Sequence, residues 1–505
     1  MKTELMPRRR LVALGLLTLA GLAAVVWAIA VPRPALYVVG LLLCAPLVVL
    51  ATAAGLRRWT ARRLVLWPAG VLVVLAALVA AIAVPRAALA AQTRSDVRWA
   101  TSLDVPLPMS TPISVWSIGD RVYLLSAQQP LQAYDKAGGQ VVAEFPAARY
   151  GATAVAADGS VVGWDGDAGE VTHYSPDGAE LWSRPFRGRG AIGTLDKPTP
   201  VVAVADGVVV LADCRVQLPA KPCRWTGVDK SGKTVWEQQD DRAAEINPGL
   251  ADIGRRTVAP LPSVVLGRDG TGSTAEYVVR AAADGRELGR HAARPLTSLG
   301  IQGDLVVIAE RTEDGCRLVG LRDGRQVLAT QGMTCLKGMN AEVPGRLRLT
   351  PGRAYLEQDG NARTVSLKDG SWRAVSGLTF STGDEPAVAG SDVLVYRNGS
   401  ELSAVDAGTG ERLWKKSAPG EVVAVYVDNG GLLVFSEPRI HNPFLSRADQ
   451  TGEAIQASSW VARTGERTGS LLIRNGDATR GASVGPGQAL LVGYCTPDVR
   501  LVGSA

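Results

Sequence analysis

The chain has 505 residues, of which 54 are Lys or Arg and 48 are Asp or Glu, giving a formal net charge of +6. Eleven of the basic residues but only one acid, Glu4, lie in residues 1–95. The rest of the chain holds 43 basic and 47 acidic residues, so its charge gives no reason to expect nucleic acid as a partner. Only ten basic residues are Lys, and Ala, Val and Gly are abundant, which suggests a GC-rich bacterial genome.

Three uncharged apolar runs of 21 residues each dominate the amino-terminal region: Leu11–Val31, Leu36–Leu56 and Leu64–Val84. At 1.5 Å of rise per residue, each run is long enough to cross the hydrocarbon core of a bilayer. A backbone in lipid must satisfy its own hydrogen bonds, so each run should be helical. The sequence therefore predicts three transmembrane helices.

Basic residues set the orientation of these helices. Arg8–Arg10 precede the first run and four Arg fill the linker at 57–63, whereas the other side has only Arg33 and Arg86 near the helix ends. The positive-inside rule places the amino terminus and that linker in the cytoplasm. Three crossings then make the chain a multi-pass protein of the cytoplasmic membrane, with residues 1–10 inside, a juxtamembrane stalk at 85–96 and residues 97–505 outside.

Two processing alternatives are open. The first run could be a signal peptide, but its length and the two runs that follow favour a membrane span. Ala88-Leu89-Ala90-Ala91 has the small-residue pattern of a signal-peptidase site, so release of the outer domain by cleavage near Ala90 is a second alternative.

From about Val97 onward, short β-type runs alternate with Gly and Asp turns, and one unit recurs. The clearest copy is Asp392–Trp414, DVLVYRNGSELSAVDAGTGERLW, and further copies end at Trp182 and Trp236. In all three copies Trp stands four residues after the turn Gly. A repeat of this kind indicates a solenoid or a propeller.

The turn glycines fall at positions 139, 178, 232, 285, 324, 370, 410 and 465. Their spacing of 39 to 55 residues is close to the length of a four-stranded propeller blade. Glycine takes the positive φ that a tight hairpin needs, and the neighbouring Asp or Asn caps its own backbone. The spacing therefore predicts short β-sheets joined by tight turns.

The signature Ala-Val-Asp406-Ala-Gly-Thr-Gly410-Glu-Arg-Leu-Trp414 resembles the PQQ-like β-propeller repeat family, and weaker copies extend over roughly residues 97–505. This resemblance implies an all-β propeller, and the BamB-like branch of the family is non-enzymatic. We expect about eight four-stranded blades, with seven as an alternative. Strict counting gives nine units, so we expect one unit, in the 285–324 region, to be degenerate.

Ring closure and blade packing can also be predicted. Val97–Leu103 looks like an isolated outer strand, and strands near 489–495 and 499–502 lack one, so pairing them would close the ring and remove the exposed edges. Each repeat Trp is a large apolar body that can dock between blades and bury about 150–250 Å². We assign this blade-packing role to Trp99, Trp182, Trp236 and Trp414.

The five cysteines beyond Cys44 lie in the outer part, where disulfides can form. Cys214 and Cys223 bracket a loop between two strands, and Cys316 and Cys335 flank the hairpin at Gly324. Both pairs are predicted to form local disulfides, since no His lies near either pair to favour a metal. Cys495 has no assigned partner.

No catalytic, cofactor-binding or metal-binding motif is recognisable. The three His residues, His173, His291 and His441, lie in different units, and no nucleophile elbow, His-Glu-x-x-His or phosphate-binding glycine loop occurs. Quinoprotein dehydrogenases that share the repeat bind PQQ beside a vicinal Cys pair, and no two Cys are adjacent here. The resemblance therefore implies the scaffold without the cofactor.

The leading hypothesis is a membrane-tethered binding or scaffolding module for envelope proteins, peptides or cell-wall glycans. Propeller enzymes draw catalytic residues from separate blades, so a hydrolase or lyase with its site in the propeller funnel is an alternative. A third hypothesis is a membrane sensor that relies on a separate output partner.

Overall fold

The computed structural model describes residues 20–21, 23–24, 97–103, 113–126, 130–146, 153–165, 168–186, 201–214, 222–243, 260–270, 275–292, 294, 297–338, 342–376, 387–389, 392–428, 430–438, 454–474, 480–485, 488–492 and 499–504. Residues 20–21 and 23–24 are helical. None of the described helical residues belongs to a helix with the length and hydropathy of a membrane span. Apart from these four residues, the spans expected at 11–31, 36–56 and 64–84 lie outside the described residues.

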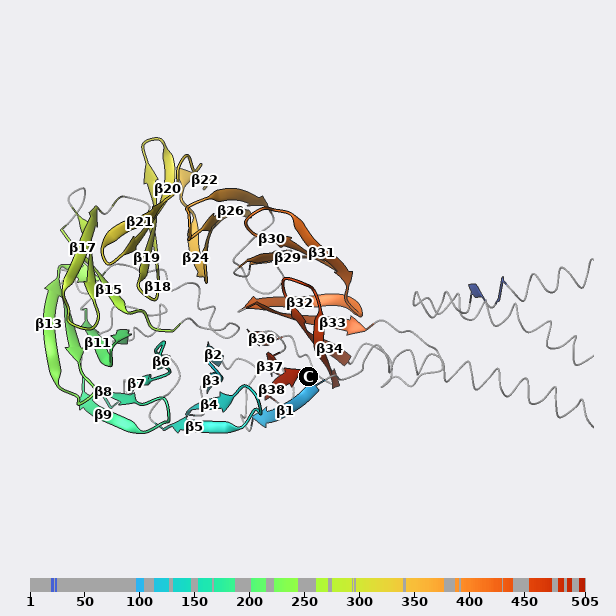
Figure 1. Ribbon diagram of the computed structural model, residues 1–505, viewed down its shortest axis with the longest axis horizontal. Coiled ribbons are helices and arrows are strands. Elements are labelled where there is room, and N and C mark those ends of the chain that lie inside the picture. Colours follow the sequence, from blue (N-terminus) through green and yellow to red (C-terminus); the bar gives the residue numbers. More distant parts are fainter. Residues whose placement is uncertain are drawn as a thin grey trace, which may run out of the picture.

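The described part of residues 97–505 folds into antiparallel sheets arranged as a ring, which confirms the all-β propeller (Figure 1). Eight sheets each take four strands that are consecutive in the chain. The first four are β2–β5 (Ile113–Ile118, Arg121–Ser126, Leu131–Asp135, Val141–Phe145), β6–β9 (Thr153–Val155, Val161–Asp165, Glu170–Tyr174, Glu180–Pro185), β10–β13 (Val201–Ala205, Val208–Asp213, Cys223–Val228, Thr234–Asp240) and β14–β17 (Arg242–Ala243, Val264–Asp269, Glu276–Ala281, Glu287–Ala292). The other four are β18–β21 (Ser298–Gln302, Leu305–Thr312, Gly315–Arg322, Arg325–Ala329), β24–β27 (Arg346–Thr350, Arg353–Gln358, Asn361–Ser366, Trp372–Ser376), β28–β31 (Ala387–Ala389, Val393–Asn398, Glu401–Asp406, Arg412–Ser417) and β32–β35 (Gly420–Asp428, Gly431–Pro438, Ala454–Val461, Arg467–Arg474).

One further four-stranded sheet closes the ring. It combines the last three strands, β36 (Arg480–Gly485), β37 (Gln488–Val492) and β38 (Val499–Ser504), with the first strand, β1 (Val97–Leu103), in the order β1-β38-β37-β36. Val97 pairs with Ser504 and Leu103 with Val499. The predicted closure by the first strand is therefore confirmed. It joins strands from the two ends of the propeller and leaves no gap in the ring.

The expectation of about eight four-stranded blades is met by the eight sheets of consecutive strands, and the closing sheet adds a ninth. The 285–324 region is not degenerate, because β18–β21 form a complete sheet. The least regular sheet is the preceding one, whose first strand β14 has only two residues. A small additional sheet pairs β22 (Leu336–Lys337) with β23 (Glu342–Val343).

All eight predicted turn glycines lie between the third and fourth strands of these eight blades, with φ between +63° and +85°. In seven of the blades the pairing of the third and fourth strands shifts register next to this turn. Glycine at positive φ beside a bulge is a common way to close such a hairpin, because other residues would be strained there.

The two faces of the ring follow from the strand order. Antiparallel strands place the first-to-second and third-to-fourth turns of every blade on one face, which we call the turn face. The second-to-third connections and the links between blades lie on the opposite face, which we call the loop face. Turns of neighbouring blades meet on the turn face, where Arg121 binds Asp177 at 2.9 Å and Gln488 donates to the Lys136 carbonyl at 2.9 Å.

The core lies between blades. Val264, Leu266 and Val279 of the β14–β17 blade pack with Val306 and Ile308 of the β18–β21 blade in one buried cluster, and similar clusters join other neighbouring blades. In the described part of the ring, neighbouring blades thus pack face to face, as a propeller requires.

Candidate functional site

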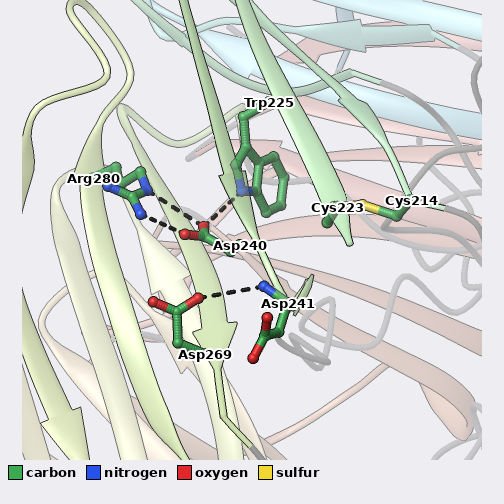
Figure 2. The surroundings of a disulfide bond; sticks show 7 residues. All are labelled: Cys214, Cys223, Trp225, Asp240, Asp241, Asp269 and Arg280. Carbon is green, nitrogen blue, oxygen red and sulfur yellow. Dashed lines mark hydrogen bonds and ion pairs between the residues drawn. A yellow bond between two sulfur atoms is a disulfide. The ribbon is translucent and has the colours of Figure 1, made fainter. Parts of the chain in front are cut away.

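The two predicted disulfides are present, Cys214–Cys223 and Cys316–Cys335, with Cα–Cα distances of 4.2 and 4.9 Å. Cys214 follows β11 and Cys223 opens β12, so this bond closes a second-to-third connection on the loop face (Figure 2). Cys316 lies at the loop-face end of β20, and Cys335 follows β21. Both disulfides therefore brace the same face of the ring, two blades apart.

A buried carboxylate lies beside the first disulfide. Asp240 ends β13 and pairs in register with Cys223, and its side chain has no exposed surface. It accepts a hydrogen bond from the Trp225 indole at 2.7 Å and forms an ion pair with Arg280 of the next blade, as Figure 2 shows. Trp225, Asp240 and Arg280, which we call the Asp240 cluster, thus link the β10–β13 and β14–β17 blades.

A glycine of the neighbouring blade leaves room for the Asp240 carboxylate. Gly267 lies on β15, and a Cβ atom added there would be 1.9 Å from Asp240 Oδ2. Only glycine allows the carboxylate to lie this close to β15. The close approach ties the position of Asp240 to the sheet of the neighbouring blade.

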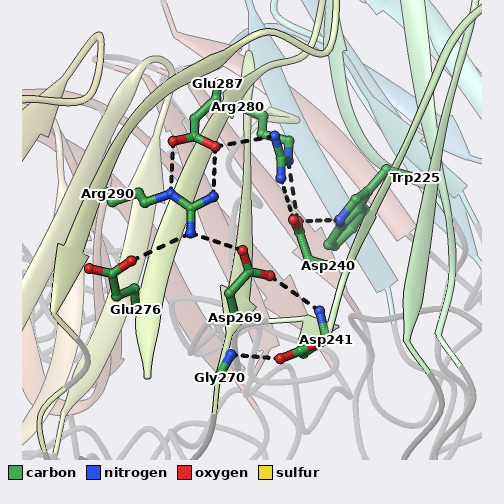
Figure 3. Close-up of polar contacts among 9 residues, drawn as sticks. All are labelled: Trp225, Asp240, Asp241, Asp269, Gly270, Glu276, Arg280, Glu287 and Arg290. Atoms are coloured by element: carbon green, nitrogen blue, oxygen red, sulfur yellow. Dashed lines mark hydrogen bonds and ion pairs between the residues drawn. The ribbon is translucent and has the colours of Figure 1, made fainter. Parts of the chain in front are cut away.

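The ion-pair network continues over the outer strands of the β14–β17 blade (Figure 3). Arg280 approaches Glu287 at 3.8 Å, and Arg290 binds both Glu287 oxygens at 2.8 and 2.9 Å. Arg290 also contacts Asp269 at 3.0 Å and Glu276 at 3.4 Å. The hydrogen bonds from Arg290 hold the pKa of Glu287 below its usual value.

A second buried carboxylate, Glu310, lies between the β14–β17 and β18–β21 blades near the other disulfide. Its Oε1 accepts from Arg317 Nε at 2.5 Å, and its Oε2 lies 3.4 Å from His291 Nε2 and 3.7 Å from Arg294 Nε. We call these four residues the Glu310 cluster. Burial raises the pKa of Glu310, but the bonds from His291 and Arg317 outweigh it and leave the pKa lowered.

Both clusters pair charges between blades. The carboxylates of Asp240 and Glu310 are fully buried and are held by guanidinium groups, as buried charges in proteins usually are. Asp240 ends β13, the fourth strand of its blade, whereas Glu310 lies on β19, the second strand of its blade. Within the described part of the chain, no three His, Cys, Asp or Glu side chains are grouped to hold a metal ion.

Comparison with known proteins identifies the family. The sequence profile described as outer membrane protein assembly factor BamB matches residues 127–316 and 353–478, which is more than half of the chain. The chain belongs to the BamB family. No curated protein sequence matches this BamB-family chain.

Three solved structures are similar to this BamB-family chain at low sequence identity. BamB from Moraxella catarrhalis is 13% identical, with 70% of this chain and 96% of that chain covered and a TM-score of 0.34. The quinohemoprotein alcohol dehydrogenase from Comamonas testosteroni is 12% identical, with 82% of this chain and 78% of that chain covered and a TM-score of 0.38. The computationally designed Ika8 protein is 12% identical, with 79% of this chain and 98% of that chain covered and a TM-score of 0.39.

The repeat tryptophans of this BamB-family chain lie between blades. Trp182, Trp236 and Trp414 are 6%, 9% and 8% exposed. Each lies against the turn glycine of the next blade. A Cβ atom added to that glycine would be 3.0 Å or less from the nearest atom of the tryptophan side chain. Trp236 and Trp414 also donate to the carbonyls of Ala282 and Ala462, three residues before those glycines. Trp99 lies in β1, opposite Gly503.

Sequence reasoning missed both buried carboxylates, although a signal was present. Asp240 follows the buried Trp236 by four residues on β13, so the period of two places both on one face of the strand. Glu310 follows Ile308 by two residues on β19 in the same way. Such a buried carboxylate can therefore be recognised as an acidic residue near the end of a strand, on the same face as buried apolar residues.

The remaining predicted positions are separate from the two clusters. His173 is buried on β8, where its ring lies 5.5 Å from that of Trp182, and neither ring nitrogen has a hydrogen-bond partner among the described residues. His441, Cys44 and Cys495 lie outside the described residues. Of the two His residues that the structure describes, His291 has a place in a cluster and His173 does not.

The buried His173 predicts a pH dependence of stability. Burial lowers the pKa of His173 from 6.5 to about 4. Above pH 6.5 the ring is neutral in both folded and unfolded chains. As the pH falls from 6.5 towards 4 only the unfolded chain gains the proton, so stability should fall by about 3 kcal/mol. The H173F substitution should remove this contribution, and urea unfolding of both proteins at pH 7 and pH 4.5 would measure it. An equal loss in both proteins would contradict the prediction.

Proposed function

We propose that the protein is a membrane-tethered, extracytoplasmic binding and scaffolding module that holds envelope proteins, peptides or glycans on its loop face. Membership of the BamB family and the propeller fold support the binding role. The three uncharged 21-residue runs and the arginine bias support the tether and its orientation.

The observation that carries this proposal is the direction in which the chain enters the ring. β1 is the outer strand of the closing sheet, and its first residue, Val97, pairs with Ser504 at the turn-face end. The stalk at 85–96 has twelve residues and can span at most about 40 Å. A tether that joins the ring at this end supports an orientation with the turn face towards the bilayer and the loop face away from it.

The loop face suits partner contact because it is braced where strands end. Both disulfides and the carboxylates of Asp240 and Glu310 lie at strand ends on this side, within three consecutive blades from β10 to β21. Cross-links and buried ion pairs limit the movement of these strand ends. A partner that binds beside them therefore meets a preorganised surface and loses less entropy on binding.

Fluorescence energy transfer tests the orientation. Single cysteines would replace Asp284 on the turn face or Asp314 on the loop face, both exposed, in a chain with Cys44 and Cys495 changed to Ser. An impermeant maleimide donor should label both positions in intact cells. Strands of six to eight residues separate the faces by about 20–25 Å, so transfer to an acceptor dye in the outer leaflet should be clearly stronger from position 284.

The outcomes of this experiment are distinct. Labelling of neither position in intact cells, but of both after lysis, would overturn the extracytoplasmic location. Stronger transfer from position 314 would reverse the orientation and remove the argument for the loop face. Equal loss of label from both positions into the medium would indicate cleavage near Ala90.

Site-specific photo-crosslinking tests the binding role at the same two positions. A photoreactive amino acid at position 314 should give a discrete cross-linked species on intact cells, and the same group at position 284 should not give that species. An identical pattern at both positions, or no adduct at position 314, would contradict the use of the loop face for binding.

A further inference from the structure

We propose that the stalk at 85–96 docks on an exposed apolar part of the rim, formed by Val141 and Val142 at the start of β5, with Leu89 as its main contact. This inference rests on the proposed function, because it concerns the tether that joins the propeller to the membrane. Docking gives the tether a fixed course along one blade and thereby limits how the ring can turn above the bilayer.

Val141 and Val142, which we call the valine pair, are exposed on the rim of the ring. Their exposed fractions are 46% and 44%, and they follow the turn glycine Gly139. Ala143 and Phe145 of the same strand are buried in the cluster that this blade shares with the β6–β9 blade. Because side chains alternate along a strand, Val142 lies on the opposite side of β5, which faces the closing sheet.

The chain enters the propeller beside the valine pair. Gln488 of the closing sheet donates to the carbonyl of Lys136, in the turn that leads into β5. In several other blade pairs the outer strand lies against the turn glycine of the next blade, as the repeat tryptophans do. β1 is the outer strand of the closing sheet and lies next to β5 on the rim (Figure 1). The residues that precede Val97 therefore begin their course next to the valine pair.

The stalk has the length and composition to cover these valines. Ala87–Ala91 contains only apolar residues, of which Leu89 is the largest. Leu89 precedes Val97 by eight residues, which span about 12 Å as a helix and up to about 28 Å when extended. Arg94 of the stalk can also reach Glu144, an exposed carboxylate on the same side of β5 as Val142. The segment thus offers both an apolar contact and a charge of the right sign.

The valine pair is poorly placed for contact with lipid. Asp135 and Lys136 lie at the turn that precedes it on the turn face, so they would enter the bilayer before the valines. Burying these charged groups in lipid is costly. A segment that lies along the rim covers the valines without moving those charges, and the covalent link to β1 keeps that segment at a high local concentration.

Cysteine alkylation tests the contact, in the full chain in detergent with Cys44 and Cys495 changed to Ser. V142C should react with a maleimide more slowly than V327C, the matched control, because Val327 is also an exposed outer-strand valine three residues after its turn glycine. L89A should raise the rate at V142C about tenfold, the factor expected when one leucine loses its apolar contact, and should leave V327C unchanged. Mass spectrometry first confirms that the purified chain retains residue 89.

A direct cross-link and three contrary outcomes complete the test. Copper phenanthroline should oxidise L89C/V142C to a disulfide within one chain, and it should not do so for L89C/V327C. Equal alkylation of V142C and V327C, or no change at V142C in L89A, would overturn the docking. Disulfides between two chains would assign the valine pair to a second copy, and protection of V142C that is present in membranes but lost in detergent would assign it to lipid. Either result would overturn the stalk as the occupant.

This inference and the proposed function can fail separately. The orientation experiment measures which side of the membrane and which face of the ring a dye reports in intact cells, whereas alkylation in detergent measures only whether the stalk covers the valine pair. A free stalk with the expected orientation would overturn the docking alone, and a docked stalk with label only after lysis would overturn the extracytoplasmic location alone.

Discussion

Replacing Asp240 with alanine should lower the free energy of unfolding by about 3–5 kcal/mol, the cost typical of breaking a buried ion pair by removing one partner. The Arg280 side chain is only 8% exposed and would remain charged without its carboxylate. The Trp225 indole would lose its acceptor as well. Urea unfolding of the full chain in detergent, followed by tryptophan fluorescence, would measure the change.

Three further variants separate the ion pair from a general effect of substitution. D284A removes a carboxylate that is 58% exposed, pairs with the exposed Arg286 and accepts a turn hydrogen bond from the Arg286 amide, so it should cost no more than about 1 kcal/mol. The double variant D240L/R280M removes both charges and should recover much of the loss. A D240A chain that is as stable as D284A would contradict the assignment of Asp240 as a buried, paired charge.

Gly267 provides an independent test of the same contact. Its φ is not in the left-handed region, so alanine is compatible with the backbone, and the added Cβ would instead displace the Asp240 carboxylate. G267A should therefore destabilise the wild-type chain by more than it destabilises D240A. Additive effects of the two substitutions would show that the Gly267 contact does not act through Asp240.

The fold could be predicted from the sequence because its strongest constraints are local. A hairpin turn at positive φ needs glycine wherever it occurs, so eight glycines marked the eight blades of consecutive strands. The closing sheet could also be predicted, because Val97–Leu103 had strand character but no partner nearby in the sequence. These features depend on backbone conformation and on strand edges, which a sequence shows directly.

The prediction that the 285–324 unit is degenerate was wrong, and the contacts of its turn explain why. In this region Leu328 and Gly289 stand where other units have Trp, four residues after the turn glycines. The structure shows that leucine serves in the same place, since Leu328 lies against the turn glycine of the next blade, Gly370. At Gly289 the missing side chain lets the strand approach the Gly324 turn directly, where a Cβ would be 2.5 Å from the Gly324 carbonyl oxygen. A missing Trp is therefore compatible with a complete blade.

The candidate site was less predictable than the fold because ion pairs between blades join residues far apart in the sequence. Asp240 and Arg280 are 40 residues apart, and nothing in either strand alone indicates its partner. The disulfides could be predicted because each joins residues of one local loop or hairpin. Partner choice between blades depends on the register of whole sheets, which a single sequence does not show.

Replacing Trp414 with alanine should cost about 3–5 kcal/mol, the range typical of deleting a large buried aromatic side chain. Trp414 is 8% exposed, stacks on Trp460 with ring centroids 6.3 Å apart, and donates to the Ala462 carbonyl at 2.8 Å. It thus joins the β28–β31 and β32–β35 blades by apolar contact and by a hydrogen bond. Unfolding of W414A in urea would measure the loss, with V235A as the control because Val235 is 48% exposed.

Phenylalanine substitutions distinguish the hydrogen bond from the apolar contact. W414F leaves the Ala462 carbonyl without its indole donor and should cost about 1 kcal/mol more than W182F, because the Trp182 nitrogen has no partner among the described residues to lose. Equal costs for the two variants would show that apolar contact alone holds the repeat tryptophans in place. A larger cost for W414F would show that the indole-to-carbonyl bond, which Trp236 also makes, strengthens the contact between blades.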